Sequence, residues 1–247
     1  MINIVIPMAG RGSRFLDAGF KTPKPMIPVF ETPMIKLVIE NLRPRCKHRF
    51  IFLCLEEHIE KFNLINKLNK WSPGCEIVVV KEVTDGAACT VLLAEKYINN
   101  EDQLMIANSD QWVDIDINDY LDKSIQPNLD GLIMTMYADD NKWSFVELNE
   151  LDYVMNIVEK EVISTTATVG IYNFNKGSDF CQSANQMIKK GKKVNGEYYV
   201  APVYLEMINN EKNIGVYDIG YIGKGMHGLG TPKDLDDFIK LNLFNNK

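Results

Sequence analysis

Short apolar runs rich in Ile and Val recur along the first half of the chain, and segments with apolar residues at helical spacing separate several of them. The apolar runs predict strands at Ile2–Ile6, Arg49–Leu55, Glu76–Val80, Gln103–Ala107 and Gly131–Tyr137. The intervening segments predict helices at Pro33–Leu42, Glu57–Leu68 and Ala87–Tyr97. Strands that alternate with helices favour right-handed crossovers and a mostly parallel sheet with both faces covered.

The second half of the chain has shorter strands with turn residues between them. It predicts strands at Ser144–Leu148, Val154–Glu159 and Thr168–Phe174, a helix at Ser178–Lys190 and a last helix at Lys233–Leu243. No linker rich in Pro, Gly or Ser separates the halves, and only the polar tail Asn245–Lys247 is expected to be disordered. We therefore expect one α/β domain over residues 1–247, in which an α+β lobe at 141–247 elaborates the sheet of 1–140.

Composition narrows the choice of partners. The 247 residues are 46% hydrophobic and 24% charged, with a formal net charge of −6. This balance disfavours a nucleic-acid partner, and any anionic ligand must be met by locally placed Lys and Arg. The five cysteines have no C-x-x-C spacing, the N-terminus lacks a signal-peptide pattern, and no apolar run is long enough to cross a membrane. We expect a cytoplasmic protein without a membrane partner.

The loop after the first predicted strand carries the clearest candidate chemistry. Gly10 and Gly12 let the backbone approach a ligand closely. Arg11, Arg14 and Lys24 supply the positive charge that a polyphosphate needs. The loop is not a dinucleotide motif, because phenylalanine occupies its third glycine position, and it lacks the G-K-[ST] ending of a P-loop. We therefore interpret residues 7–25 as a grip for phosphate groups.

Two further candidates follow predicted strands. Gly86 lies after the strand at 76–80, and Asp110 lies after the strand at 103–107. Because ligands of open α/β sheets bind beyond the carboxyl ends of the strands, we expect the glycine loop, Gly86 and Asp110 to share one crevice. A carboxylate is a hard oxygen ligand of the kind that Mg²⁺ prefers, so Asp110 is a candidate metal ligand.

The phosphate-grip region resembles the signature of the sugar-1-phosphate nucleotidyltransferase family, G-x-G-[TS]-R followed by P-K, which is PMAGRGSRF at residues 7–15 and KTPKP at residues 21–25 here. The resemblance implies a Rossmann-like fold of the GT-A type, a nucleoside triphosphate as one substrate and Mg²⁺ as cofactor. It implies that Arg14 and Lys24 are catalytic residues that hold phosphates, and that Asp110 binds the metal. The other nucleotide-binding residues that it implies are Met8, Ala9, Gly10, Arg11, Gly12, Ser13, Thr84, Gly86, Ala87 and Ser109.

The second half of the chain extends the resemblance. Residues 158–160, VEK, are similar to an acceptor motif of the family, and residues 167–172, ATVGIY, are similar to the T-G-x-Y strand that follows it. Residues 196–199, GEYY, correspond to the start of a later acceptor-site helix. The resemblance implies that residues 1–140 mainly bind the nucleotide. It also implies that residues 141–247 mainly bind a phosphorylated small-molecule acceptor through Glu159, Lys160, Gly170 and Tyr198.

One position departs from the family pattern. Family members commonly have a metal-binding Asp in the motif W-x-D-x-G-T-P, whereas residues 226–232 are MHGLGTP, with Gly228 at the position of the acid. Either Asp110 and substrate oxygens hold one metal alone, or another group such as Asp218 or His227 takes the place.

The whole-sequence resemblance is to small cytidylyltransferases of bacterial capsule and surface-polysaccharide pathways. It implies transfer of CMP from CTP to phosphoglutamine, which gives CDP-glutamine and pyrophosphate, and it leaves a homodimer open. A sugar-1-phosphate nucleotidylyltransferase that makes an NDP-sugar is the first alternative. A GT-A glycosyltransferase is the second, because Asp114-Ile115-Asp116 forms a D-x-D. A non-catalytic nucleotide sensor is the third, because the acid expected at Gly228 is missing.

Overall fold

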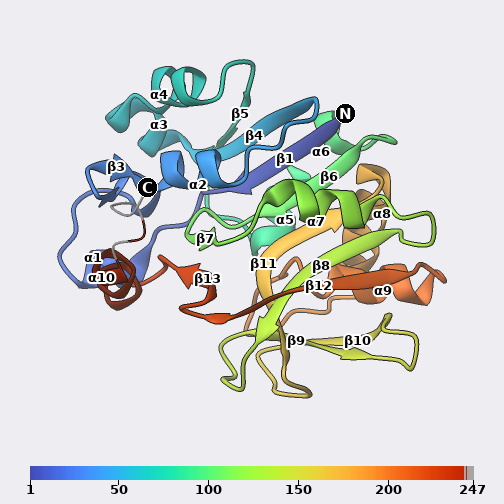
Figure 1. The fold of residues 1–247 in the computed structure, drawn as a ribbon. Helices are drawn as coiled ribbons and strands as arrows, with labels where there is room; N and C mark the ends of the chain where they lie inside the picture. The colour runs from blue at the N-terminus through green and yellow to red at the C-terminus, as the bar shows by residue number, and fades with distance from the viewer. Residues whose placement is uncertain (242, 244–247) are drawn as a thin grey trace.

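A mixed β-sheet forms the centre of the molecule, and helices cover both of its faces (Figure 1). The computed structural model describes residues 1–241 and 243, so the tail Asn245–Lys247 that was expected to be disordered lies outside the described residues. The strands are β1 (Ile2–Pro7), β4 (His48–Leu55), β5 (Glu76–Val80), β6 (Gln103–Ala107), β7 (Gln111–Val113), β8 (Gly131–Tyr137), β9 (Ser144–Leu148), β10 (Val154–Glu159), β11 (Thr166–Phe174), β12 (Ile214–Ile222) and β13 (Gly225–Gly228). Their order in the sheet is β5-β4-β1-β6-β11-β8-β12-β13-β7, with β9 and β10 beside this path.

The strands β5, β4, β1 and β6 pair in parallel, as the alternating strand and helix pattern predicts. Apolar side chains along β1 point alternately to the two faces of the sheet, so both faces must be covered by helices. Ile4 and Ile6 belong to one hydrophobic cluster, and Val5 between them belongs to the other. The predicted fold class, one α/β domain with a mostly parallel mixed sheet flanked by helices, is thereby confirmed.

Two sets of helices complete these clusters. The first cluster receives α2 (Met34–Asn41), α3 (Glu56–Phe62), α4 (Leu64–Trp71) and α7 (Ile117–Ser124). The second receives α5 (Ala87–Leu92), α6 (Glu95–Ile98), α8 (Gly177–Lys189) and α9 (Val203–Asn209). Within the described residues, no helix combines the length and apolar character needed to span a bilayer.

Two predicted helices are each divided in the structure. The segment expected as one helix at 57–68 is α3 and α4, because Asn63 adopts the left-handed conformation with φ of 51° between them. The segment expected as one helix at 87–97 is α5 and α6. Between these two helices, Leu93 and Ala94 donate to carbonyls three residues earlier, which ends the regular α-helical pattern.

The second half of the chain returns to the same sheet. Strand β11 lies between β6 and β8 and is antiparallel to both. Strands β12, β13 and β7 extend the sheet beyond β8, and the β9–β10 hairpin projects from it (Figure 1). Of these, β7, β12 and β13 were not predicted, nor was α7. The expected start of a later helix at residues 196–199 is wrong, because these residues are not helical and α9 begins at Val203. How the two halves divide between nucleotide and acceptor stays a prediction.

The last helix, α10 (Pro232–Leu241), packs against the region after β1. That region contains α1 (Ser13–Asp17), η1 (Lys24–Met26) and the small pair β2 (Pro28–Val29) and β3 (Thr32–Pro33). Leu235 and Phe238 of α10 share a hydrophobic cluster with Phe15 and Ile27. Residue 242 of the helix predicted at 233–243 lies outside the described residues, and Leu243 is in a turn. The last helix thus packs beside the segment that contains the glycine loop.

Candidate active site

The loop after β1 is built around Gly12. This residue has φ of +64°, and its carbonyl accepts hydrogen bonds from the backbone N–H groups of Phe15 and Leu16 at the start of α1. A Cβ at Gly12 would lie 3.1 Å from Lys24 Cβ, so glycine is needed here both for the backbone conformation and for close packing on Lys24. Gly10 differs, because a Cβ there would meet no described atom within 4 Å.

An ion pair joins this loop to the end of β6. Lys24 Nζ lies 2.9 Å from Asp110 Oδ2, and the two side chains are 24% and 21% exposed. A Cβ at Gly230 would lie 2.7 Å from the same carboxylate oxygen, so Gly230 leaves room beside Asp110. Leu229 N donates a hydrogen bond of 2.8 Å to the carbonyl of Asp110, which holds the 228–230 turn in place.

Three adjoining cavities extend from this ion pair. The loop cavity, about 210 Å³, is lined by Gly12, Ser13, Arg14, Lys24, Asp110 and Gly230. The central cavity, about 390 Å³, is lined by Arg14, Asn108, Asp110, Gln111, Lys142, Trp143, Lys160, Ile222, Met226, Gly228, Gly230, Thr231 and Asp234. The Glu159 cavity, about 180 Å³, is lined by Ala87, Asn108, Gln111, Lys142, Trp143, Ser144, Glu159, Lys160, Thr168, Gly170, Tyr172, Tyr199 and Val200. Neighbouring cavities share lining residues, and together they form one crevice from the glycine loop to Glu159.

Glu159 is a buried carboxylate at the far end of the crevice. Its side chain is 4% exposed, Ser144 Oγ donates a hydrogen bond to Oε2, and Lys160 Nζ lies 3.4 Å from Oε1. Burial raises the pKa of Glu159, although the Ser144 hydrogen bond and the Lys160 charge act in the opposite direction. Lys160 Nζ also donates to the carbonyl of Lys142 at 2.9 Å. This end therefore offers a carboxylate acceptor for a hydroxyl or amine and two ammonium groups for a phosphate.

Gly170 shapes the floor between the central cavity and the Glu159 cavity. It has φ of +88°, and a Cβ there would lie 2.3 Å from Asn108 Nδ2 and 2.6 Å from Gln111 Oε1. Asn108 N donates a hydrogen bond of 3.1 Å to the carbonyl of Gly170. The missing side chain at position 170 thus leaves the space that the Asn108 and Gln111 amides occupy.

The backbone of Tyr198 holds the turn that contains Gly86 and Ala87, two of the residues implied to bind the nucleotide. Tyr198 N donates to the carbonyl of Asp85 at 2.7 Å, and Ala88 N donates to the carbonyl of Tyr198 at 3.0 Å. A Cβ at Gly86 would lie 2.5 Å from Tyr198 N and O, so only glycine allows this approach. Ala87, next to Gly86, is the residue of the turn that lines the Glu159 cavity.

The structure turns the side chain of Tyr198 away from the crevice. It is buried in the second hydrophobic cluster, and its hydroxyl donates to the carbonyl of Ile188 at 3.3 Å. The neighbouring Tyr199 lines the Glu159 cavity instead, with Lys160 Nζ 5.4 Å from its ring centroid. Burial raises the pKa of the Tyr199 hydroxyl. The sequence offered no signal for choosing between two adjacent tyrosines.

The remaining predicted nucleotide-binding residues are spread around the glycine loop and the turn at Gly86. Met8 and Ala9 have buried side chains in the two core clusters, so only their backbone is available to a ligand. Ser109 is also buried, and Arg11 is exposed. Thr84 Oγ1 donates to the carbonyl of Gly86 at 3.0 Å. Their contacts with a ligand stay predictions.

Comparison with known proteins places this chain in a family. The family model described as nucleotidyl transferase matches residues 4–220. The chain belongs to the nucleotidyl transferase family. Among curated relatives, the bifunctional protein GlmU of Methanococcus aeolicus is 24% identical over 243 residues, which cover 96% of this chain and 53% of that protein. The chain thus spans about half the length of the curated relatives it matches.

Solved structures of similar proteins show the same fold as this nucleotidyl transferase family member. The nucleoside-diphosphate-sugar pyrophosphorylase from Vibrio cholerae RC9 has a TM-score of 0.79 and 24% identity, and the match covers 96% of this chain and 99% of that one. The inositol-1-phosphate CTP transferase from T. maritima has a TM-score of 0.74 and 16% identity, and the match covers 97% of this chain and 94% of that one.

In this member of the family, neither of the two residues considered as a replacement for the missing acid at position 228, Asp218 and His227, lines the crevice. His227 is buried, and its ring lies 5.3 Å from Trp112 and 5.5 Å from Phe238 between centroids. Burial lowers the pKa of His227, which favours the neutral ring. Asp218 lines a separate surface hollow beside β12. The acid that lines the central cavity near Gly228 is Asp234, which sequence reasoning missed.

The D-x-D of this family member has a local structural role. Asp116 is the N-cap of α7, where its side chain accepts a hydrogen bond from Asn118 N at 2.9 Å, and it pairs with Arg45. Asp114 N donates to the carbonyl of Gly225 at 2.7 Å, which joins the end of β7 to β13. The contacts of the Asp116 side chain account for this acid without a nucleotide-sugar ligand, whereas Asp114 contributes only its backbone N–H.

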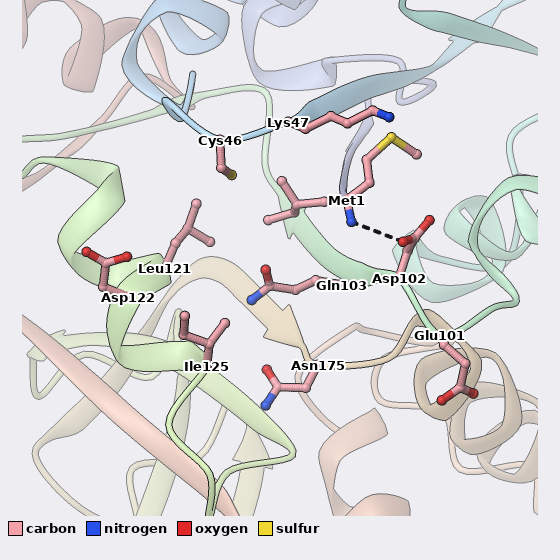
Figure 2. Close-up of a pocket in the computed structure, with 11 residues that line it drawn as sticks. Met1, Cys46, Lys47, Glu101, Asp102, Gln103, Leu121, Asp122, Ile125 and Asn175 are labelled. Atoms are coloured by element: carbon pink, nitrogen blue, oxygen red, sulfur yellow. Dashed lines mark hydrogen bonds and ion pairs between the residues drawn. The ribbon is translucent and has the colours of Figure 1, made fainter.

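A separate cavity lies at the amino ends of β1 and β6, and Figure 2 shows its lining side chains. This opposite cavity has a volume of about 610 Å³. The amino group of Met1 lies 3.1 Å from Asp102 Oδ1 at its edge, the contact drawn as a dashed line in Figure 2. Gln103 in its wall donates to Ser124 Oγ at 2.6 Å. None of the residues predicted for nucleotide or acceptor binding lines this opposite cavity.

Proposed function

We propose that this member of the nucleotidyl transferase family transfers a nucleoside monophosphate from a nucleoside triphosphate to a phosphorylated small molecule, with release of pyrophosphate. The observation that carries the proposal is the continuous crevice with cations along its length. Arg14 and Lys24 line the loop cavity, and Lys142 and Lys160 line the other two cavities. Such a reaction brings two polyanions together, so the protein must offset their repulsion and hold them in line.

The chemistry asked of the protein is mainly positioning. An oxygen of the acceptor phosphate attacks the α-phosphorus and forms a new P–O bond. The bond from the α-phosphorus to the oxygen that bridges to the β-phosphate breaks, and pyrophosphate leaves with that electron pair. A phosphate monoester has a second pKa of about 6, so the attacking oxygen is largely ionised at neutral pH and needs no general base.

The residues divide the work between the two ends of the crevice. Lys24 and Arg14 offset the charge of the triphosphate, and the Gly12 turn brings backbone close to it. Lys160 holds the acceptor phosphate, and Glu159 accepts a hydrogen bond from a donor group on the acceptor. The short ion pair of Lys24 and Asp110 keeps the catalytic lysine at the loop cavity before substrate binds.

The residues at the Asp110 end fit a divalent cation. Asp110 offers hard carboxylate oxygens, and Gly230 leaves space in which a Cβ would lie 2.7 Å from one of them. Across the described residues, no group of three or more His, Cys, Asp or Glu side chains gathers as a closed metal cage. This agrees with Mg²⁺, which takes one or two carboxylates together with phosphate oxygens and waters. When bound, Mg²⁺ would draw negative charge from the triphosphate and help to orient it.

For the specific substrates we propose CTP and phosphoglutamine, as in the CTP:phosphoglutamine cytidylyltransferase of bacterial capsular phosphoramidate biosynthesis. The resemblance of the whole sequence supports this choice. The name of the T. maritima neighbour, an inositol-1-phosphate CTP transferase, supports CTP as a donor on this fold. The paired carboxylate and ammonium groups of Glu159 and Lys160 suit an acceptor that carries both an amine and a phosphate.

An NDP-sugar product is the alternative, and the names of other similar proteins favour it. The V. cholerae structure is a nucleoside-diphosphate-sugar pyrophosphorylase. A carboxylate such as Glu159 also accepts hydrogen bonds from sugar hydroxyls. The same crevice therefore serves either acceptor, and the base and acceptor must be decided by assay.

The test is a matrix of nucleoside triphosphates against sugar 1-phosphates, phosphocholine and phosphoglutamine, with pyrophosphate release and product mass as readouts. We expect CTP with phosphoglutamine to give the highest rate. A highest rate with a sugar 1-phosphate would support the NDP-sugar alternative. Nucleotide binding without turnover against every acceptor would overturn transferase activity in favour of a sensor, and glycosyl transfer from a nucleotide sugar would indicate a glycosyltransferase.

A further inference from the structure

Two carboxylates from distant parts of the chain line the central cavity. Asp110 follows β6, and Asp234 lies in the first turn of α10. We propose that Asp234 is the second carboxylate ligand of the divalent cation, supplied by α10 because position 228 has no side chain. This inference rests on the proposed function, in which the cation serves nucleotidyl transfer.

The space around the 228–230 turn points to Asp234. A Cβ at Gly228 would lie 3.7 Å from Asp234 Cγ and 3.8 Å from its Oδ2. An acidic side chain at position 228 would therefore share the region that the Asp234 carboxylate already occupies. A Cβ at Gly230 would lie 2.7 Å from Asp110 Oδ2. The two glycines thus leave a cradle with a carboxylate beside each of them.

The Asp234 carboxylate is held in a fixed orientation. Thr231 Oγ1 donates to Asp234 Oδ2 at 2.7 Å, and Asp234 N donates to Thr231 Oγ1 at 3.1 Å. Outer hydrogen bonds of this kind orient carboxylate ligands at metal sites. The same pair of bonds caps the start of α10, so the test must separate metal binding from helix capping.

A third oxygen in the central cavity independently points to a polar ligand. Gln111 lines this cavity and is 7% exposed, and its Oε1 has no hydrogen-bond partner among the described residues. A buried acceptor without a partner is unfavourable. Mg²⁺ generally keeps several water ligands, so a hydrated cation in this cavity would supply donors for such an oxygen.

Helix α10 gives Asp234 a rigid base. Leu235 and Phe238 are buried in the cluster that also contains Phe15 of α1, directly after the glycine loop. The hydrogen bond from Leu229 N to the Asp110 carbonyl ties the segment before α10 to the end of β6. The carboxylates of positions 110 and 234 are therefore held by the same packed unit that positions the loop.

The test is Mn²⁺ titration of the full chain with the metal alone, followed by electron paramagnetic resonance of the free ion. We expect Asp234→Asn and Asp110→Asn each to weaken Mn²⁺ binding at least 10- to 100-fold, the range typical for loss of an outer-shell partner. Asp236→Asn is the matched control, because Asp236 is an exposed acid on the same helix. It should leave Mn²⁺ affinity unchanged.

Asn at position 234 keeps an oxygen that can accept the Thr231 hydrogen bond, and thermal unfolding of each variant checks that the cap survives. The proposal would be overturned if Asp234→Asn bound Mn²⁺ as tightly as Asp236→Asn, or if the wild-type protein bound no Mn²⁺. Asp234 would then be a capping residue only.

A second variant moves the acid to position 228. Gly228→Asp added to Asp234→Asn should restore most of the lost affinity, because a side chain at 228 meets only ordinary contact distances. If the Mn²⁺ affinity did not recover, an acid at position 228 could not replace the Asp234 carboxylate, which would contradict the proposal that the two share one place at the metal.

Pyrophosphate release separates this inference from the proposed function. Mn²⁺ binding that depends on Asp234 in a protein that turns over no donor and acceptor pair would overturn the proposed function and leave the metal site standing. Turnover in a protein whose Mn²⁺ affinity does not depend on Asp234 would support the proposed function and overturn the metal site at Asp234.

Discussion

The crevice and the opposite cavity lie at the two ends of the same central strands, β1 and β6. The opposite cavity, at about 610 Å³, is larger than any one of the three cavities of the crevice, of which the central cavity is the largest at about 390 Å³. Its polar groups include the Met1 amine with Asp102 and Gln103 with Ser124, each engaged with another protein group. Among the described residues, each site has a buried amide oxygen without a partner, Gln111 Oε1 in the crevice and Asn175 Oδ1 at the opposite cavity. The crevice differs because it gathers four cations and a buried carboxylate with a raised pKa. The comparison teaches that converging cations, and not the volume of a single cavity, mark the candidate active site.

The two cavities can be compared through one lysine in each. Lys24→Ala removes the cation that pairs with Asp110 and should lower kcat at least about 100-fold, the typical effect of losing one electrostatic stabiliser of a transition state. Lys47→Ala is the control, because Lys47 lines the opposite cavity, and it should leave kcat unchanged. The measurements are pyrophosphate release and urea unfolding. Equal losses in the two variants would remove the distinction between the cavities.

Two glycines sharpen the comparison. Gly170→Ala places a Cβ 2.3 Å from Asn108 Nδ2 at a φ of +88°, and it should cost about 1–3 kcal/mol of unfolding free energy. Because the Asn108 and Gln111 amides must shift, it should also lower kcat/KM for the acceptor about 10- to 100-fold. Gly177→Ala near the opposite cavity places a Cβ 2.0 Å from the Ile98 carbonyl oxygen. It should destabilise without changing the kinetics of the folded enzyme, and a kinetic effect there would contradict the assignment.

Carboxylates in the two cavities should respond to pH with opposite signs. Burial raises the pKa of Glu159 above 4.5, so the contribution of Glu159 to the stability of the wild type falls as pH rises from about 4.5 through the raised pKa. Glu159→Gln does not titrate, and its unfolding free energy should therefore rise relative to wild type over that window. The pKa of Glu101, which lines the opposite cavity, is lowered by its hydrogen bond with Lys176. Its stabilising effect should be present above pH 4.5 and be lost as pH falls through the lowered pKa.

Urea unfolding of wild type, Glu159→Gln and Glu101→Gln between pH 3 and 7 measures both signs. A Glu159→Gln variant that loses stability relative to wild type as pH rises would show that Ser144 and Lys160 outweigh burial. The carboxylate of Glu159 would then be an ordinary ion-pair partner like that of Glu101.

Much of the fold could be predicted because periodicity and strand-end rules act locally. The alternation of Ile4, Val5 and Ile6 gives a strand buried on both faces, and Asp110 directly after β6 reaches the crevice edge. Strand β13 was not predicted because glycines at both of its ends interrupt the apolar pattern of a strand. A Cβ at Gly225 would lie 1.6 Å from the Ile219 carbonyl oxygen, a close approach that only the folded chain reveals.

The unpredicted parts of the candidate site depend on tertiary packing. Tyr199 lines the crevice because the backbone of Tyr198 is bound to the 85–88 turn, which fixes the direction of both rings. Asp234 reaches the central cavity because α10 shares a hydrophobic cluster with α1, and these two helices lie far apart in the sequence. Helix α7 is a different case, since Asp116 as N-cap and Ile117, Tyr120 and Leu121 at helical spacing were a usable signal.

The smallest expected effect is at the ion pair of the opposite cavity. Asp102→Asn weakens the contact with the Met1 amine. The side chains of Met1 and Asp102 are 26% and 37% exposed, and an exposed ion pair of this kind contributes about 0–1 kcal/mol to the free energy of unfolding. Urea unfolding should therefore change little, and the small difference should shrink at high salt because exposed charges are screened. Pyrophosphate release should equal that of wild type. Because Asp102 lies at the amino end of the strand whose carboxyl end precedes Asp110, a loss of turnover here would mean that the two ends of β6 are functionally coupled.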